Sequence, residues 1–355
     1  MTSANRAIAL QQAGTGGAGL ALVCLSALAV ALACAELALG PVSLTVDRVL
    51  AALAGDGTQV ETAIVWQIRL PRLLLGLAVG VALGLAGTAL QGLLRNPLAE
   101  PGLIGVTAGA SLGAVSVIVL GGALTGLVPA FVATFMLPIG AFVGGAIVIT
   151  VLFALALRTQ GDTTLMLILA GVAINAIVGA AIGVLVYISD DQQLRDLTFW
   201  TMGSLATSQK ELVLLVLALT GLMVPVFLSQ MRALDLMRLG ERAAFHSGLD
   251  VRRARLIIAA STALAVGAVT SAAGPIGFIG LVAPHLARLL VGQRHMVLLP
   301  AAAILGICLV LAADLAVRLA VPPAEPPIAL ATSIIGGPFF LWLLLRRSKS
   351  GGLRA

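Results

Sequence analysis

The sequence predicts an all-helical (all-α) membrane protein with about ten membrane-spanning helices. Of its 355 residues, 60% are hydrophobic and 10% are charged, and the mean hydropathy is +1.11, far outside the range of soluble globular domains. A helix needs about 20 apolar residues to cross a hydrocarbon layer roughly 30 Å thick. By that measure the chain holds ten spans, at residues 18–40, 70–93, 102–121, 130–157, 163–188, 212–230, 254–273, 276–292, 297–317 and 327–345.

Glycine and proline divide the longest apolar runs. The run 102–157 is too long for one helix, and Gly121-Gly122 supplies its break. A second run is interrupted at Gly274-Pro275, because proline lacks an amide donor and disfavours helix in the residue before it. The span that follows, 276–292, is short. The 40 glycines suit helices that pack closely through small faces, and one such face is formed by Gly76, Gly80 and Gly84.

The distribution of basic residues orients the chain. An even number of spans places both termini on one side, and cytoplasmic segments are enriched in Lys and Arg. With the N-terminus inside, all but six of the 21 basic residues are cytoplasmic. The net charge of +6 therefore reflects topology, and no nucleic-acid partner is expected. The outer basic residues are Arg48, Arg69, Arg72, Arg195, Lys210 and Arg318.

Residues that could carry out chemistry are scarce. The three histidines, His246, His285 and His295, lack the spacing of a helical metal pair. Neither lysine lies in a G-x-x-x-x-G-K-[ST] loop, so the chain is not expected to bind ATP. These patterns argue against a membrane enzyme, and they predict no catalytic, metal or cofactor site in this chain.

Few ionisable residues lie within the spans. Glu36 is near the outer end of the first span, and Asp314 and Arg318 are four residues apart near the outer end of the ninth, on one helix face. They could form a local ion pair or line a water-filled outer vestibule. Neither alternative supplies the mid-membrane ion site expected of an ion-coupled secondary transporter. The energy for transport is therefore expected to come from another chain.

A charged segment at 232–255 separates the sixth and seventh spans. It carries nine charged residues in an otherwise apolar part of the sequence, and an exposed cytoplasmic segment of this kind is expected to bind a partner. The narrower prediction is that residues 236–249 make the contact. Three further basic residues mainly anchor the seventh span: Arg252, Arg253 and Arg255.

Two outer motifs each admit two interpretations. The arginines of Arg69-Leu70-Pro71-Arg72 either anchor the second span at headgroup level or bind carboxylates of an external partner. Residues 189–205 are polar and then amphipathic with aromatics, which predicts a short helix at the outer interface. That helix is either a plain anchor or a lip over a translocation path.

Six motifs follow one another between residues 60 and 346. They are Arg69-Leu-Pro-Arg72, Arg95-Asn-Pro-Leu-Ala-Glu-Pro-Gly102, Trp200-Thr-Met-Gly-Ser204, Gly274-Pro-Ile-Gly-Phe-Ile-Gly-Leu-Val-Ala-Pro-His285, Ala313-Asp314 with Arg318, and Gly336-Gly-Pro-Phe-Phe340. In this order they resemble the FecCD-type permeases, the membrane subunits of ATP-binding-cassette (ABC) importers for ferric siderophores, haem and cobalamin.

The resemblance implies the type II ABC importer permease fold, with ten helices per subunit, both termini in the cytoplasm and a homodimer in the bacterial inner membrane. A periplasmic binding protein would deliver the substrate, and two copies of a separate ATPase would bind ATP and Mg²⁺ on the inside. The implied division of the chain is an N-terminal segment with the first span (1–60), a permease domain (61–346) and a cytoplasmic tail (347–355).

The resemblance also implies roles for individual residues. Docking of the binding protein is assigned to Arg69, Arg72 and Arg318. The segment that couples to the ATPase is expected to form two short helices, and its coupling residues are Leu236, Leu239, Gly240, Glu241, Ala244 and Gly248. The translocation path or gate is assigned to Arg195, Trp200, Met202 and Gly203.

Two stretches refine these expectations. The coupling segment departs from the family pattern, with Asp235 where asparagine is frequent and His246-Ser247-Gly248 where Ser-Leu-Gly is usual. Residues 191–200 most resemble the haem permeases, so haem is the expected substrate. A ferric siderophore is the alternative, and cobalamin is less favoured.

Overall fold

The computed structural model describes residues 3–102, 105–122, 129–158, 163–206, 209–322 and 326–349, and these residues form helices and turns without a strand. In chain order the helices are α1 (Ser3–Ala38), α2 (Val46–Ala54), α3 (Gln59–Ala63), η1 (Ile64–Arg69), α4 (Leu70–Leu93), α5 (Val106–Leu120), α7 (Ala130–Arg158), α8 (Thr163–Tyr187), α9 (Asp191–Thr201), α10 (Lys210–Ser229), α11 (Met231–Arg238), α12 (Glu241–His246), α13 (Val251–Ala273), α14 (Ile279–Val291), α15 (His295–Ala320) and α16 (Ile328–Lys349).

The ten predicted spans all have a helical counterpart. Within the described ranges, seven helices are long and apolar enough to cross a membrane, and three shorter apolar helices lie in α5, α14 and α16. The helix α14, which corresponds to the eighth span, has only 13 residues. The prediction of an all-α membrane protein with about ten spans is therefore confirmed.

The outer connections contain more helix than the sequence analysis predicted. The short helix α2 was not anticipated, and the second span begins at Gln59 rather than at residue 70, because α3, the π-helical turn η1 and α4 run on without a break. Thr58 and Glu61 form a capping box at this start, with each side chain bonded to the other residue's backbone N–H. The spacing Thr-x-x-Glu carried that signal.

Glycines let α4 pack tightly at the centre of the bundle. A Cβ atom added to Gly80 would lie 2.5 Å from the backbone of Ile307 in α15, and one added to Gly84 would lie 2.3 Å from the carbonyl oxygen of Ala302. Gly87 approaches α14 in the same way, since a Cβ atom added there would lie 1.9 Å from the Gly280 oxygen. Any larger side chain would separate these helices, which confirms the predicted small packing face.

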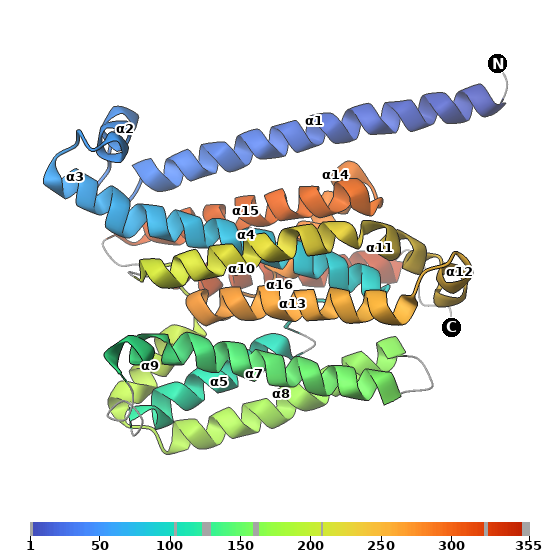
Figure 1. Ribbon diagram of the computed structural model, residues 1–355. Coiled ribbons are helices and arrows are strands. Elements are labelled where there is room, and N and C mark those ends of the chain that lie inside the picture. The colour runs from blue at the N-terminus through green and yellow to red at the C-terminus, as the bar shows by residue number, and fades with distance from the viewer. Residues whose placement is uncertain are drawn as a thin grey trace.

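The connecting helices separate into two ends of the bundle (Figure 1). The start of α1 lies at the same end as α11 and α12, whereas α2, α3 and α9 lie at the opposite end. The basic residues of the sequence identify the end with α11 and α12 as cytoplasmic. It is called the inner end below, and the other is the outer end.

Candidate functional site

The break between α13 and α14, residues 274–278, carries a strained backbone. Phe278 has φ of +66°, a region that bulky residues rarely occupy and that costs about 1–3 kcal/mol. Its N–H donates to Oε1 of Glu100 over 2.6 Å. Gly336 of α16 packs on the Phe278 ring, since a Cβ there would lie 2.3 Å from a ring carbon. Contacts from two other segments therefore hold Phe278 in this conformation.

Glu100 comes from a loop that turns back into the protein after α4. Burial raises the pKa of the Glu100 carboxyl above its ordinary value, and the hydrogen bond from Phe278 opposes this shift. Gln91 supports the same loop, donating from Nε2 to the carbonyl oxygens of Ala99 (3.2 Å) and Gly280 (3.4 Å). Non-helical backbone is tolerated at membrane depth where protein satisfies its polar groups in this way.

The turn at Trp200–Ser204 packs against the same break and is hydrogen-bonded beside it. Ser204 N–H donates to the carbonyl oxygen of Ala273 over 2.8 Å, and Ile328 N–H donates to that of Gly203 over 3.2 Å. Gly203 has φ of +66°, and a Cβ there would lie 2.7 Å from the Pro275 oxygen. Only glycine fits such a position without strain.

Four of the six motifs thus meet around residues 274–278. Of the residues predicted for the path or gate, Trp200, Met202 and Gly203 belong to the turn that packs there, and the Met202 carbonyl accepts from Ala329 N–H over 3.3 Å. Arg195 does not join them, because its exposed side chain bonds to Gln192 on α9. Sequence reasoning missed Glu100 and Phe278, although an acid inside an apolar motif was a usable signal.

A cluster of buried charges lies at the outer end, where α1, α4 and α15 meet. Arg72 binds Asp314 through two hydrogen bonds, from Nε at 2.7 Å and from Nη2 at 3.0 Å. Arg318 is bonded to the carboxylate of Glu36. Arg69 donates to the backbone carbonyl oxygens of Leu37, near the end of α1, and of Val42, between α1 and α2. All five side chains are buried, and none of the residues is more than 3% exposed.

This outer charge cluster corrects the expectation for Asp314 and Arg318. Asp314 and Arg318 do not pair with each other and do not line a vestibule: although they share a helix, one side chain reaches α4 and the other reaches α1. Direct docking of a partner on Arg69, Arg72 and Arg318 requires exposed guanidinium groups, and these are buried. Docking therefore stays a prediction, and this structure gives these arginines internal partners instead.

The charged inner segment forms the two short helices that the sequence predicted, α11 and α12. Asp235 of α11 accepts from the backbone N–H of His295 at 3.2 Å and contacts the ring Nδ1 at 2.7 Å. Arg238 donates to the backbone and side chain of Gln293. In α12, Glu241 forms an ion pair with Arg255 of α13. Arg255 therefore does more than anchor its own span, and α11 and α12 are joined to α15 and α13.

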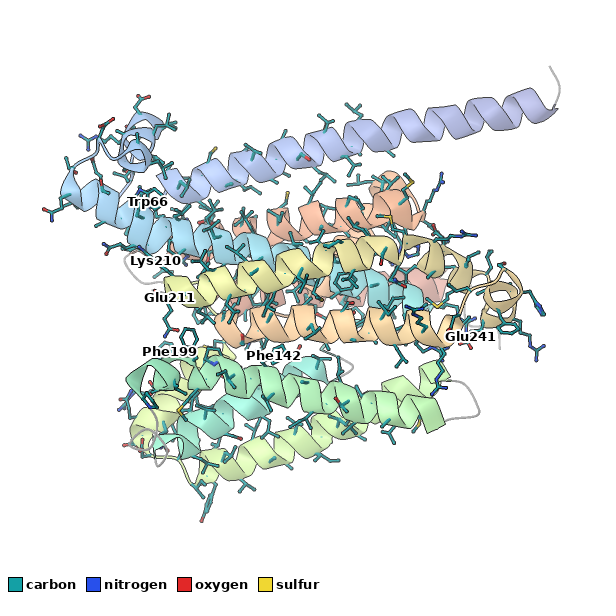
Figure 2. All side chains as sticks on the ribbon, viewed as in Figure 1. Trp66, Phe142, Phe199, Lys210, Glu211 and Glu241 are labelled. Atoms are coloured by element: carbon teal, nitrogen blue, oxygen red, sulfur yellow. The ribbon has the colours of Figure 1, made fainter. Side chains whose placement is uncertain are left out.

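The inner segment also presents apolar side chains to solvent. Leu239, at the end of α11, is 73% exposed, and Phe245 on α12 is 69% exposed. Exposed apolar residues with a charged rim are typical of a docking face. Figure 2 shows Glu241 on α12 at the end opposite Trp66 and Lys210. Ala244 is fully buried and supports α12 from behind, whereas Gly240 and Gly248 have positive φ where the chain turns.

Comparison with known proteins identifies the class of molecule. Residues 28–346 match the FecCD transport family. The chain belongs to this family. A hemin transport system permease protein, HmuU of Yersinia pestis, is 46% identical over 286 residues, covering 80% of this chain and 84% of the relative. A vitamin B12 import system permease protein, BtuC of Vibrio cholerae, is 40% identical over 82% of this chain and 86% of its own.

A solved structure shows the same fold. It is described as an ABC transporter of the metal-chelate type in an inward-facing conformation, and it superimposes with a TM-score of 0.80 at 33% identity, covering 92% of this chain and 98% of its own. The chain is thus a multi-pass membrane permease subunit with the type II ABC importer fold. Its family works with an ATPase partner, in a homodimer-type arrangement.

Proposed function

We propose that this permease imports haem across the bacterial inner membrane, driven by a separate ATPase that binds the ATP and Mg²⁺. The observation that carries the proposal is the 46% identity to a hemin permease over 80% of the chain.

ATP-driven closure of two ATPase subunits would move α11 and α12, since these helices present the inner docking face. The contacts support transmission to α15 through Asp235 and His295, and to α13 through Glu241 and Arg255. Both α13 and α15 pack on α4, and α13 leads into the break at 274–278. Switching of the break would open the path to alternate sides.

Variants of the inner segment test this coupling. Glu241→Ala and Gly240→Ala should lower uptake several-fold per ATP hydrolysed while leaving binding of an outer partner unchanged. Arg242→Ala, at an exposed neighbouring position on α12, is the matched control. Normal uptake by both variants in proteoliposomes would remove the coupling role.

A periplasmic binding protein is the proposed outer partner. The family resemblance assigns its docking to Arg69, Arg72 and Arg318, but their burial favours an indirect role in which they hold α1, α4 and α15 together. Exposed basic residues at the outer end are Arg48, Arg195 and Lys210. Arg195→Glu should weaken docking most at low salt, because exposed charges are screened by salt. A greater loss with Arg69→Glu in a correctly folded protein would restore the direct role.

The decisive experiment measures ATP-driven uptake into proteoliposomes that contain this chain and its ATPase, with the binding protein supplied outside. Labelled haem should enter, and unlabelled haem should compete better than a panel of ferric siderophores. A siderophore that competes better would establish the second candidate, which the metal-chelate-type structural relative favours. Uptake that persists without ATP would instead indicate an ion-coupled transporter.

A further inference from the structure

A basic pocket opens at the inner end of the bundle, apart from the break at 274–278. It has a volume of about 430 Å³ and lies between the end of α4, α11, α14 and the start of α15. Its described lining contains three arginines and two histidines but no carboxylate. The lining residues are Gln91, Gly92, Arg95, Pro97, Arg238, His285, Arg288, Leu289, Gln293 and His295.

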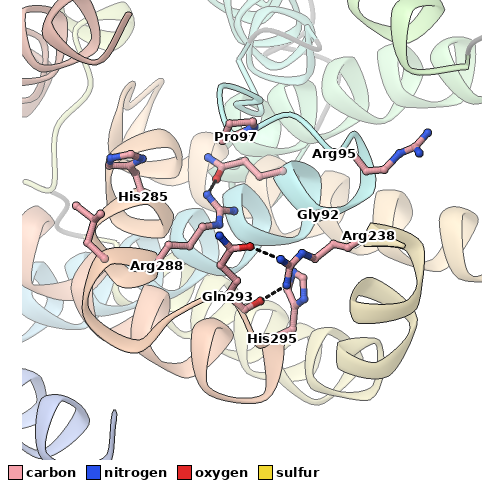
Figure 3. A pocket seen from close by; sticks show the side chains of 10 residues that line it. Gly92, Arg95, Pro97, Arg238, His285, Arg288, Gln293 and His295 are labelled. Carbon is pink, nitrogen blue, oxygen red and sulfur yellow. Dashed lines mark hydrogen bonds between the residues drawn. The ribbon is translucent and has the colours of Figure 1, made fainter. Parts of the chain in front are cut away.

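Neutral partners orient two of the guanidinium groups without cancelling their charge. Arg238 donates to Gln293, and Arg288 donates to Oε1 of Gln91, as Figure 3 shows for the first pair. Asp235 lies 4.0 Å from Arg238 and is the carboxylate at this edge, where it contacts His295. Three guanidinium charges against one carboxylate leave the pocket positive.

Buried polar side chains form part of the pocket wall, and exposed apolar side chains lie near its opening. Gln91 is 3% exposed and His295 is 1% exposed, so two buried polar side chains line it. Leu289 lines the pocket and is 64% exposed, and Met296, which follows the lining residue His295 in the sequence, is 61% exposed. At the cytoplasmic end of a membrane protein, such apolar side chains lie at the level of the inner leaflet. A positive pocket with an apolar rim matches a ligand that has an anionic head and an acyl chain.

We propose that this pocket binds the phosphate headgroup of an anionic phospholipid of the cytoplasmic leaflet, with an acyl chain along Leu289 and Met296. Basic pockets between membrane helices on the cytoplasmic side recognise such headgroups, and arginine forms paired hydrogen bonds with phosphate oxygens. A bound lipid would join Arg238 of α11 to Arg288 of α14. The inference depends on the inner orientation of this end and not on the identity of the transported substrate.

Native mass spectrometry of the full-length chain tests the proposal. The protein is stripped of lipid and then offered equal amounts of phosphatidylglycerol and phosphatidylcholine. The wild type should retain phosphatidylglycerol preferentially, and Arg288→Gln should reduce retention several-fold. Arg95→Gln, at an exposed lining position that is expected to fold normally, should reduce it as well. Arg252→Gln, an exposed cytoplasmic arginine outside the pocket, is the matched control and should retain lipid like the wild type.

Leu289→Asn separates a lipid from a free anion, because only the lipid uses the apolar rim. Reduced retention in this variant supports the proposal. If Leu289→Asn retains as much phosphatidylglycerol as the wild type, and millimolar inorganic phosphate displaces that lipid, the pocket is a phosphate site and the lipid proposal is overturned. An equal loss of lipid retention in Arg252→Gln would show that retention depends on general surface charge and not on the pocket, and would overturn the proposal. Release of the lipid when the ATPase docks would assign the pocket to that interface, and would also overturn the proposal, whereas failed haem uptake alone leaves it standing.

Discussion

The outer charge cluster and the inner charged segment use the same residue types in opposite environments. Outside, Arg72 and Asp314 are buried and joined by two short hydrogen bonds. Inside, Glu241 and Arg255 are paired at a site where the Glu241 side chain is 47% exposed. A buried charge must keep its partner because it has lost water, whereas an exposed one can exchange its partner for another protein. The outer cluster is therefore suited to fixing helices, and the inner segment to meeting a moving partner.

The largest expected effect comes from breaking the outer cluster. Asp314→Ala leaves the Arg72 guanidinium buried without its carboxylate, and removing one partner of a buried pair costs about 3–5 kcal/mol. Thermal unfolding in detergent should show this loss, and Asp314→Asn, which keeps one acceptor oxygen, should lose less. If Asp314→Ala unfolds at the wild-type temperature, the cluster does not stabilise the outer end.

An intermediate effect is expected where α11 meets α15. Asp235→Ala removes the acceptor for the backbone N–H and ring of the buried His295, and an unsatisfied buried donor costs about 1–3 kcal/mol. Asp235→Asn preserves an acceptor and should recover most of the stability. Uptake per ATP hydrolysed should fall in the alanine variant. Full coupling in that variant would exclude Asp235 from the route to α15.

The buried carboxyl of Glu100 should make stability depend on pH. Its pKa is higher in the folded protein than in the unfolded chain, so the folded state holds the proton over a range in which the unfolded state has lost it. This contribution to stability is complete below the unfolded value and is lost as pH rises through the folded value. As pH rises above the ordinary range of a carboxyl pKa, Glu100→Gln should therefore lose less stability than the wild type. If the stability of the two proteins changes with pH in the same way, the pKa of Glu100 is not raised by folding.

The smallest effect on stability is expected at the inner face. Glu241→Gln weakens a partly exposed ion pair, and such pairs contribute about 0–1 kcal/mol. Its melting temperature should stay close to that of the wild type while coupled uptake falls. A large loss of stability would instead show that the Glu241 ion pair stabilises the fold as strongly as the buried outer pairs do, which would contradict the contrast between the two regions.

Much of the fold could be predicted from the sequence, because helix length and hydropathy are local properties. The ten spans, the short α14, the two inner helices and α9 were all predicted, as was the glycine face of α4. The partners of Arg72 and Arg318 could not be predicted, because each ion pair joins residues more than 200 positions apart. Spacing on α15 favoured the neighbour along the helix, whereas packing of α15 between α1 and α4 separated the two side chains.

The candidate site was only partly predictable for the same reason. The motifs marked Trp200, Met202 and Gly203, but their meeting with Glu100 and Phe278 depends on a loop that turns back into the bundle. The docking of a binding protein, the residue roles in coupling and the boundaries of the three segments stay predictions, and the tail beyond residue 349 lies outside the described residues.

The short helix α14 has a consequence for biosynthesis. Thirteen residues form a helix about 20 Å long, which is less than the roughly 30 Å of hydrocarbon. Its first turn is completed by Glu100, a residue made 178 positions earlier. A helix this short is not expected to move from the translocon into the bilayer by itself. Because α4 and its returning loop are made first, we expect α14 to insert stably only where it can pack against them.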